Sequence, residues 1–256
     1  ELKNPVNDAL LIVNTLKQLD FDVILDTNLA DKRSFKETIR EFGNRRPNYD
    51  VAFIYYAGHG IQVGSENYLL PTKEIFESEI DVEDYGVSVQ DIMRYLTGMS
   101  DQVNVLILDA CRDNPYEKGW KGRSLKGGGL SEPQVPPTGS LVAYSTSPGD
   151  VASDNSDSDN SLYTKALSEI MKQPNLKIEE VFKRVRNVVY SGSEQNQNPQ
   201  WWGQLEGDLY LLLKEDTKVI SLEKELKDAF KKLNKYEDYL KTNDMKMFTV
   251  DDPNNI

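Results

Sequence analysis

The sequence predicts an α/β fold in which a mostly parallel sheet lies between two layers of helices. Short apolar runs rich in Val, Ile and Leu alternate with amphipathic stretches along the chain, which is the order that βαβ units produce. Two of these runs, VAFIYYA at 51–57 and VNVLIL at 103–108, are short and suit strands covered on both faces. With 256 residues, the chain can form one large core and a small second element.

The expected elements follow from hydrophobic spacing and from the residues that start helices. A first helix begins at Asn4-Pro5, and its apolar stripe comprises Val6, Ala9, Leu10, Val13, Leu16 and Leu19. A strand (FDVIL, 21–25), a helix bearing Phe35, Ile39 and Phe42, and the strand 51–57 come next. Ser88, with Asp91 at capping-box spacing, begins a further helix. The strand ending at Cys111 then precedes a strand at 140–145, helices at 162–171 and 178–189, and a last strand at 208–213.

Residues 114–139 interrupt this pattern with Gly, Pro and basic residues, NPYEKGWKGRSLKGGGLSEPQVPPTG. We expect a mobile linker that contributes nothing to the core. The linker divides a domain at 1–214 into a large part, 1–113, and a small part, 140–214.

Residues 215–256 are expected to form a helical C-terminal extension. Its apolar residues follow a heptad spacing through Leu222, Leu226, Ala229, Leu233, Tyr236 and Leu240. Two interpretations stay open: the helix packs on its own domain, or it binds a partner helix or a second copy through 220–241.

The charge balance is acidic, with a net charge of −12 and a pI near 4.7, which argues against nucleic acid as the main partner. Seven acids and no base lie at 74–91, and Asp150, Asp154, Asp157 and Asp159 form a second acidic group. Such groups are either solvated faces or sites for cations, which here means a basic substrate side chain or calcium.

Other classes of protein are disfavoured by what the sequence lacks. No apolar run approaches the roughly 18 residues of a membrane span, and no signal peptide opens the chain, so we expect a cytoplasmic protein without membrane contact. The single cysteine rules out an internal disulfide and fits a reducing compartment.

The chemistry is expected at the ends of two strands. His59 and Cys111, the only histidine and the only cysteine, lie 52 positions apart, each just past an apolar run. In a parallel sheet, both belong to the carboxyl edge, where sites form. A neighbouring imidazole raises the thiolate fraction of a cysteine, so the pair suits a nucleophile and its base. The amide of Gly60, together with that of Cys111, is a candidate for oxyanion stabilisation.

The motifs LKNPVNDA, YYAGHG, LILDACR, AYSTSPG and GDLYL resemble those of caspase-like cysteine peptidases, peptidase family C14, and especially the bacterial members related to metacaspases and paracaspases. The spacing agrees with the caspase pattern of a histidine about 50 residues before the cysteine. The resemblance implies a caspase-like three-layer sandwich and a thiol endopeptidase whose His-Cys dyad needs no cofactor. Family members usually have one more strand before the LKNPVNDA helix. Metacaspases often need calcium, for which 74–91 is the candidate here.

The resemblance also implies specificity. Asp109 stands before Ala110-Cys111 as in metacaspases, where this aspartate lines the substrate pocket, and Asp154 stands where caspases have the arginine that holds a substrate aspartate. Replacing a positively charged pocket residue by a negatively charged one reverses the charge of the substrate side chain that the pocket prefers, so cleavage after Arg or Lys is expected. Ser145 is expected beside the substrate. Trp201 and Trp202, in a loop at 196–205, either cover the substrate or form a packed aromatic pair.

In the family, the linker is often cut on activation. Here it offers four basic residues for self-cleavage, and a plain soluble loop is the alternative; the four are Lys118, Lys121, Arg123 and Lys126. Two other functions remain open: a non-cleaving caspase-like scaffold that binds a partner, and a dormant effector switched on by domains outside this chain.

Overall fold

The computed structural model describes residues 4–96, 102–111, 130, 138–147, 158–214 and 217–242; for Cys111 and for several residues near the ends of the last helix, it describes the backbone alone. Residue contacts divide the chain into two units, Glu1–Leu212 and Leu213–Ile256. None of the helices in the described ranges is both long and apolar enough to cross a membrane.

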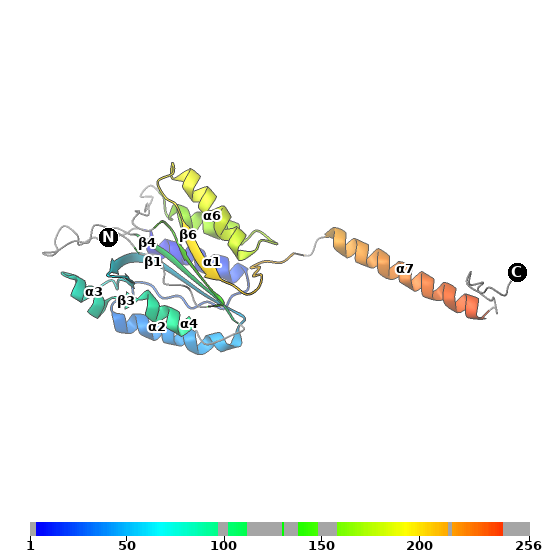
Figure 1. Cartoon of the computed structure of the whole chain (residues 1–256), viewed down its shortest axis with the longest axis horizontal. Helices are drawn as coiled ribbons and strands as arrows, with labels where there is room; N and C mark the ends of the chain where they lie inside the picture. The colour runs from blue at the N-terminus through cyan, green and yellow to red at the C-terminus, as the bar shows by residue number, and fades with distance from the viewer. Residues whose placement is uncertain are drawn as a thin grey trace, which may run out of the picture. The chain divides into compact units, whose positions relative to one another are not determined.

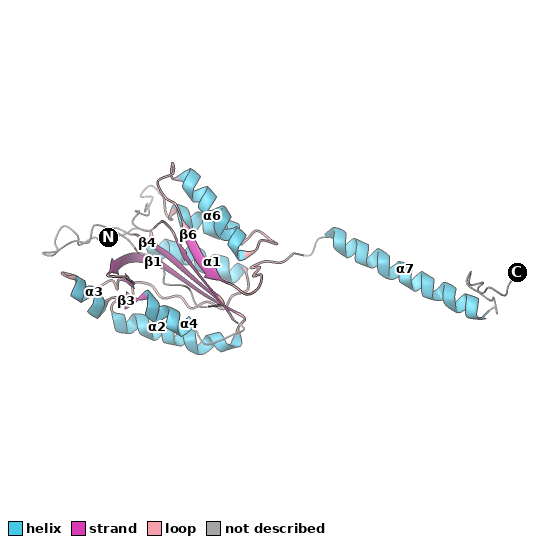
Figure 2. Ribbon diagram, in the orientation of Figure 1, coloured by secondary structure: helices cyan, strands magenta, loops and turns pink. Residues whose placement is uncertain are grey.

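A six-stranded mixed sheet forms the centre of the first unit, in the order β3-β2-β1-β4-β5-β6 (Figures 1 and 2). The three strands β1, β4 and β5 run parallel, whereas β2, β3 and β6 pair antiparallel at the two edges. The strands are β1 (Val51–Val63), β2 (Glu66–Leu69), β3 (Val87–Ser88), β4 (Val103–Cys111), β5 (Ser140–Tyr144) and β6 (Gln200–Gln204). The helices of this unit are α1 (Pro5–Gln18), α2 (Lys32–Arg45), α3 (Glu79–Tyr85), α4 (Val89–Leu96), α5 (Leu162–Met171) and α6 (Ile178–Gly192), with a 3-10 turn, η1 (Arg46–Asn48).

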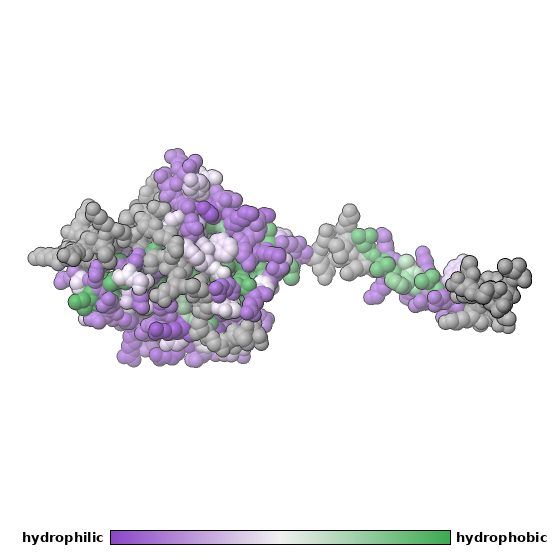
Figure 3. Space-filling view, in the orientation of Figure 1, coloured by the Kyte–Doolittle hydropathy of each residue, from purple (hydrophilic) through white to green (hydrophobic). Residues whose placement is uncertain are grey.

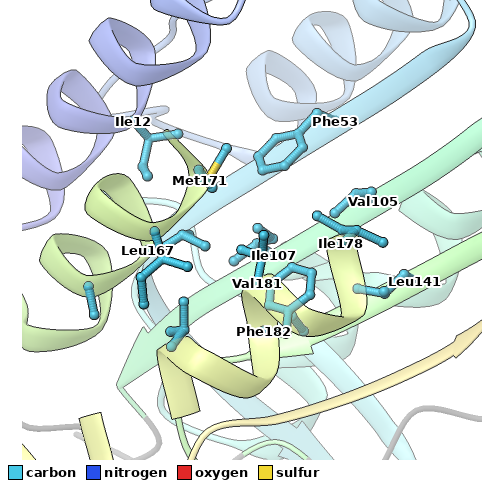
Figure 4. Packing of buried hydrophobic residues seen from close by; sticks show 14 of the residues in the cluster. Ile12, Phe53, Val105, Ile107, Leu141, Leu167, Met171, Ile178, Val181 and Phe182 are labelled. Atoms are coloured by element: carbon cyan, nitrogen blue, oxygen red, sulfur yellow. The ribbon is translucent and has the colours of Figure 1, made fainter. Parts of the chain in front are cut away.

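Helices cover the sheet on both faces, which confirms the predicted three-layer α/β sandwich. On one face, α1, α5 and α6 pack against alternate residues of the central strands, among them Phe53, Val105 and Ile107 (Figure 4). On the other face, α2 and α4 pack against the intervening residues, such as Leu106 and Leu108. This alternation explains the near-continuous apolar character of β4, because a strand buried on both faces has no solvent side.

Two predicted strands are absent from the described sheet. Residues 21–25 form no ladder, although Phe21 packs edge-to-face on Phe53 with ring centroids 6.0 Å apart. Residues 208–213 make only an isolated bridge, Lys177 to Tyr210. Both segments contribute apolar side chains to the core cluster of the α1, α5 and α6 face without joining the sheet. Hydrophobicity thus indicated contact with the core, although Leu25 and Leu213 are exposed, but a strand also needs a neighbour with free backbone groups.

Other segments differ from the prediction in detail. The expected loop at 196–205 contains the edge strand β6, and the acidic stretch contains the short helix α3. The Ser88 hydroxyl accepts a hydrogen bond from the Gln90 amide at 3.1 Å, so it caps the start of α4 without the expected capping box.

Leu130 corrects the expectation that 114–139 contributes nothing to the core. Its side chain is 1% exposed and belongs to the core cluster of the α2 and α4 face. Leu130 is therefore the one buried residue in the part of the linker that the structure describes.

Candidate active site

The parallel pairing of β1 and β4 ends at His59 and Cys111. β4 ends there, whereas β1 continues to Val63, so the strand expected at 51–57 is longer than predicted and includes His59. The two strands pair in parallel without a slip from Val51 and Val103 up to His59 and Cys111, which are direct register partners. Adjacent strands lie about 4.8 Å apart, so the backbones of the histidine and the cysteine are neighbours. The sheet thus brings together the two residues that the sequence singled out, although the structure does not describe the cysteine side chain.

The backbone around His59 is held from two sides. Its carbonyl oxygen accepts hydrogen bonds from the Tyr56 hydroxyl at 2.9 Å and from the Leu70 amide at 3.0 Å. Gly58 makes the first bond possible, because a Cβ at this position would lie 2.5 Å from the Tyr56 hydroxyl oxygen. Position 58 therefore needs a small residue, because the Tyr56 hydroxyl that holds the His59 carbonyl occupies the adjacent space.

Gly60 lies in a closely packed place. A Cβ there would lie 3.1 Å from the Ala110 Cβ and 3.1 Å from a methyl group of Leu130. Gly60, which follows the histidine, therefore contacts both Ala110, which precedes the cysteine, and Leu130 of the linker. This contact joins β1, β4 and the linker next to the candidate dyad.

Asp109 is a buried carboxylate two residues before Cys111. Its Oδ2 accepts hydrogen bonds from the Ser161 hydroxyl at 2.6 Å, the Thr164 hydroxyl at 2.7 Å and the Tyr55 hydroxyl at 3.3 Å. Ser161 is also the N-cap of α5, since its Oγ accepts from the Thr164 amide at 3.0 Å. The positive end of the α5 dipole thus faces a negative group, which is favourable. Within the described ranges, Asp109 forms no ion pair.

A second buried carboxylate, Asp8 on α1, lies on the same side of the sheet. Its Oδ1 accepts from the Asn160 side-chain amide at 2.9 Å and from the Ser161 backbone amide at 3.0 Å. Burial, followed by the charges of Asp109 and Asp8, raises the pKa of Tyr55 well above its ordinary value. The tyrosine therefore stays protonated and donates to Asp109. Carboxylates gathered in this way create a local preference for a cation.

Sequence reasoning missed Asp8, Tyr55, Ser161 and Thr164. A signal for Asp8 existed, since it lies one helical turn before Ile12 on the buried face of α1. The two hydroxyl residues of α5 carried no comparable signal, because serine and threonine at a helix start are usually explained by capping alone.

The remaining predicted substrate residues occupy separate places. Ser145 is buried directly after β5; its amide donates to the Leu108 carbonyl at 3.1 Å, and its carbonyl accepts from the Gln197 side chain at 2.8 Å. Trp201 and Trp202 are half-buried neighbours on β6 and contribute to the clusters on opposite faces of the sheet. Trp202 packs edge-to-face on Tyr144 at 5.5 Å. The two tryptophans therefore do not pack on each other.

Other predicted residues lie outside the described residues. They are Asp154 and the four cleavage candidates Lys118, Lys121, Arg123 and Lys126. In the described part of the acidic groups, no set of three or more His, Cys, Asp or Glu side chains is arranged to hold a metal ion. Asp81 of the 74–91 stretch instead accepts from the Ser78 hydroxyl at 2.9 Å and from the Glu77 amide at 2.9 Å, at the start of α3.

Comparisons with known proteins agree with the fold. The family model described as the caspase domain, Peptidase C14, matches residues 1–210. The human mucosa-associated lymphoid tissue lymphoma translocation protein 1 is 28% identical over 120 residues, 46% of this chain and 14% of that protein. Its mouse homolog is 29% identical over 122 residues, again 46% of this chain and 14% of the relative. The matched segment is thus a small part of each relative.

Proposed function

The chain belongs to the caspase-domain family of peptidases, and we propose that it is a cysteine endopeptidase that cleaves polypeptides after Arg or Lys. The observation that carries the proposal is the register pairing of His59 with Cys111 at the carboxyl edge of the parallel strands. Two positions that are paired by backbone geometry need no rearrangement of the sheet to act as base and nucleophile.

The reaction assigns one role to each partner. The Cys111 thiolate attacks the peptide carbonyl carbon, and a carbon–sulfur bond forms. His59, which takes up the thiol proton, gives a proton to the leaving amine as the carbon–nitrogen bond breaks. Water activated by the same imidazole then hydrolyses the thioester and regenerates the thiol. The amides of Gly60 and Cys111 are the proposed donors to the oxyanion.

The proposed preference for a basic residue rests on Asp109. The carboxylate is buried two positions before the nucleophile, its described partners are neutral hydroxyls, and it pairs with no described cation. A buried carboxylate without a counter-ion gains most from a guanidinium or an ammonium group supplied by a substrate. Asp154, which the resemblance places at the same pocket, is the proposed second anion.

The test is turnover of matched fluorogenic peptides that end in Arg, Lys or Asp, with and without added calcium. Cys111→Ala provides the blank, and His59→Ala tests the base. Cleavage after Arg and Lys that both variants abolish is the expected result. Cleavage after Asp would refute the pocket assignment. No cleavage by intact, folded protein, with or without calcium, would favour the non-cleaving scaffold or the dormant effector.

We also propose self-cleavage in the linker at one or more of Lys118, Lys121, Arg123 and Lys126. The support is chemical: these are the residues that the proposed pocket accepts, and they lie on the chain between β4 and β5. Incubation of the wild-type chain should give two fragments whose new C-terminus is one of these residues by mass spectrometry. A mixture of wild-type protein with tagged Cys111→Ala protein separates cutting within one chain from cutting between chains. An active enzyme whose own linker stays intact would refute self-cleavage alone.

A further inference from the structure

The second unit is dominated by α7 (Thr217–Thr242), a helix of 26 residues with one apolar face. The seam residues with described side chains are largely exposed: Leu222 at 56%, Leu226 at 59%, Leu233 at 55% and Tyr236 at 70%. Figure 3 shows hydrophobic surface along this helix. A row of exposed leucines at heptad spacing is a surface that another helix covers.

The heptad register can be assigned from the seam. Leu226, Leu233 and Leu240 occupy a positions, and Leu222, Ala229 and Tyr236 occupy d positions. The a-to-d steps of three and the d-to-a steps of four persist from one end of the helix to the other. This constant register suits a partner with the same repeat.

The residues at the flanking e and g positions distinguish a parallel from an antiparallel pair of α7 helices. In a parallel dimer, each g residue faces the e residue five positions later on the other helix. This places Lys232 opposite Glu237 of the second copy and, by register, Lys218 opposite Glu223. The remaining pair, Glu225 and Phe230, does not bring two like charges together.

An antiparallel dimer with the same overlap is disfavoured by charge. In that arrangement g faces g and e faces e, so Lys232 lies opposite its own copy. By register, Glu223 then lies opposite Glu237. Like charges across such an interface are destabilising, whereas the parallel arrangement has opposite charges at the same places.

We propose that α7 is a dimerisation helix and that its occupant is the α7 of a second copy of this chain, in a parallel two-stranded coiled coil. The proposal does not depend on peptidase activity, because it rests on the seam and on its flanking charges. In a parallel pair, the domains that precede the two helices are attached at the same end of the coil. Dimerisation therefore raises the concentration of one catalytic domain around the linker of the other.

The test is sedimentation equilibrium of the full chain carrying Cys111→Ala, so that self-cleavage cannot change the mass. We expect a concentration-dependent dimer of twice 29.1 kDa. Leu226→Lys with Leu233→Lys should raise the dissociation constant by about 100-fold or more, since each substitution removes a leucine from the apolar seam and places a charge there. Asn234→Lys on the outer face adds the same type of charge and should leave the dimer intact. A chain that stays monomeric at 100 µM, or a dimer that survives both leucine substitutions, would overturn the proposal.

A charge exchange tests the orientation. Lys232→Glu and Glu237→Lys should each weaken a parallel dimer by about three- to tenfold, and the double variant should restore wild-type affinity. In an antiparallel dimer, Glu237→Lys alone would strengthen association, because it removes a repulsion. That outcome, or failure of the double variant to recover, would refute the parallel arrangement.

Discussion

Replacing Asp109 by Asn removes one charge and keeps the shape of the side chain. The carboxylate oxygen of Asp109 that accepts from Ser161 at 2.6 Å and from Thr164 at 2.7 Å loses its charge. If this carboxylate holds the substrate's basic group, the variant leaves a buried substrate cation without its partner. The loss for a buried hydrogen-bonded charge pair is about 2–5 kcal/mol, which corresponds to a factor of about 30 up to several thousand in kcat/KM.

The assay compares peptides that end in arginine with peptides that end in citrulline, the neutral isostere of arginine. The ratio of the two kcat/KM values within one enzyme sample is independent of the fraction of folded protein. We expect a ratio of about 30 or more for the wild-type chain and a ratio several-fold smaller for Asp109→Asn, in which Asp154 is the remaining proposed anion. Asp159→Asn is the matched control, since Asp159 is exposed and the charge change is identical.

The thermal midpoint separates binding from structure. Because Asp109 accepts charge-assisted hydrogen bonds from α5, the variant should also lose about 1.5–3 kcal/mol of folding stability. A variant that loses this stability and keeps the full arginine preference would refute the reasoning. Asp109 would then be a purely structural anchor of α5.

Three further predictions follow from single contacts. Gly58→Ala should lower kcat/KM by about 100-fold, because the added methyl group displaces the Tyr56 hydroxyl and thereby shifts His59. Gly207→Ala is the control: the space around Gly207 is open, so kcat/KM should not change. Arg46→Met should lower the free energy of unfolding in urea by about 3 kcal/mol, because the buried Arg46 guanidinium donates hydrogen bonds to the last carbonyls of α4. Arg33→Met, which removes an exposed ion pair, should change this free energy by less than about 0.5 kcal/mol. Burial and a neighbouring glutamate raise the pKa of Tyr68 to about 12. The contribution of the protonated tyrosine to stability is therefore complete below about pH 10 and is lost as the pH rises toward 12. Tyr68→Phe should reduce the fall in thermal midpoint between these two pH values, and an unchanged fall would refute the assignment.

The sequence was sufficient to predict the centre of the fold and the placement of His59 and Cys111 at one edge of the sheet. The apolar runs of β1, β4 and β5 are each followed by residues of a different chemical kind, so these strands and their shared edge could be recognised, although β1 itself continues to Val63. The register between His59 and Cys111 could not be derived in advance, because it depends on the pairing of β1 with β4 from Val51 and Val103 onward.

Long-range polar contacts were beyond sequence reasoning. Asp8 and Ser161 are 153 positions apart, and the bond between them depends on how α1 and α5 pack side by side. The runs at 21–25 and 208–213 failed as strands for a related reason, because pairing is a property of two segments. In the second case, the amide of Ile178 donates to the Leu209 carbonyl at 2.8 Å, so the segment is bonded to the start of α6 and not to the sheet.

The linker joins two strands that lie next to each other in the middle of the sheet. Five consecutive residue pairs, from Asn104 with Ser140 to Leu108 with Tyr144, connect the segments before and after it, and Leu130 packs against Gly60 on the earlier side. All four basic residues of the linker precede Leu130, so a cut at any of them leaves this leucine attached to the later fragment. The products would remain one particle, two polypeptides held by a shared sheet. Processing of this protein would consequently be invisible to gel filtration and evident only on a denaturing gel, and its effect would come from the release of two new chain ends.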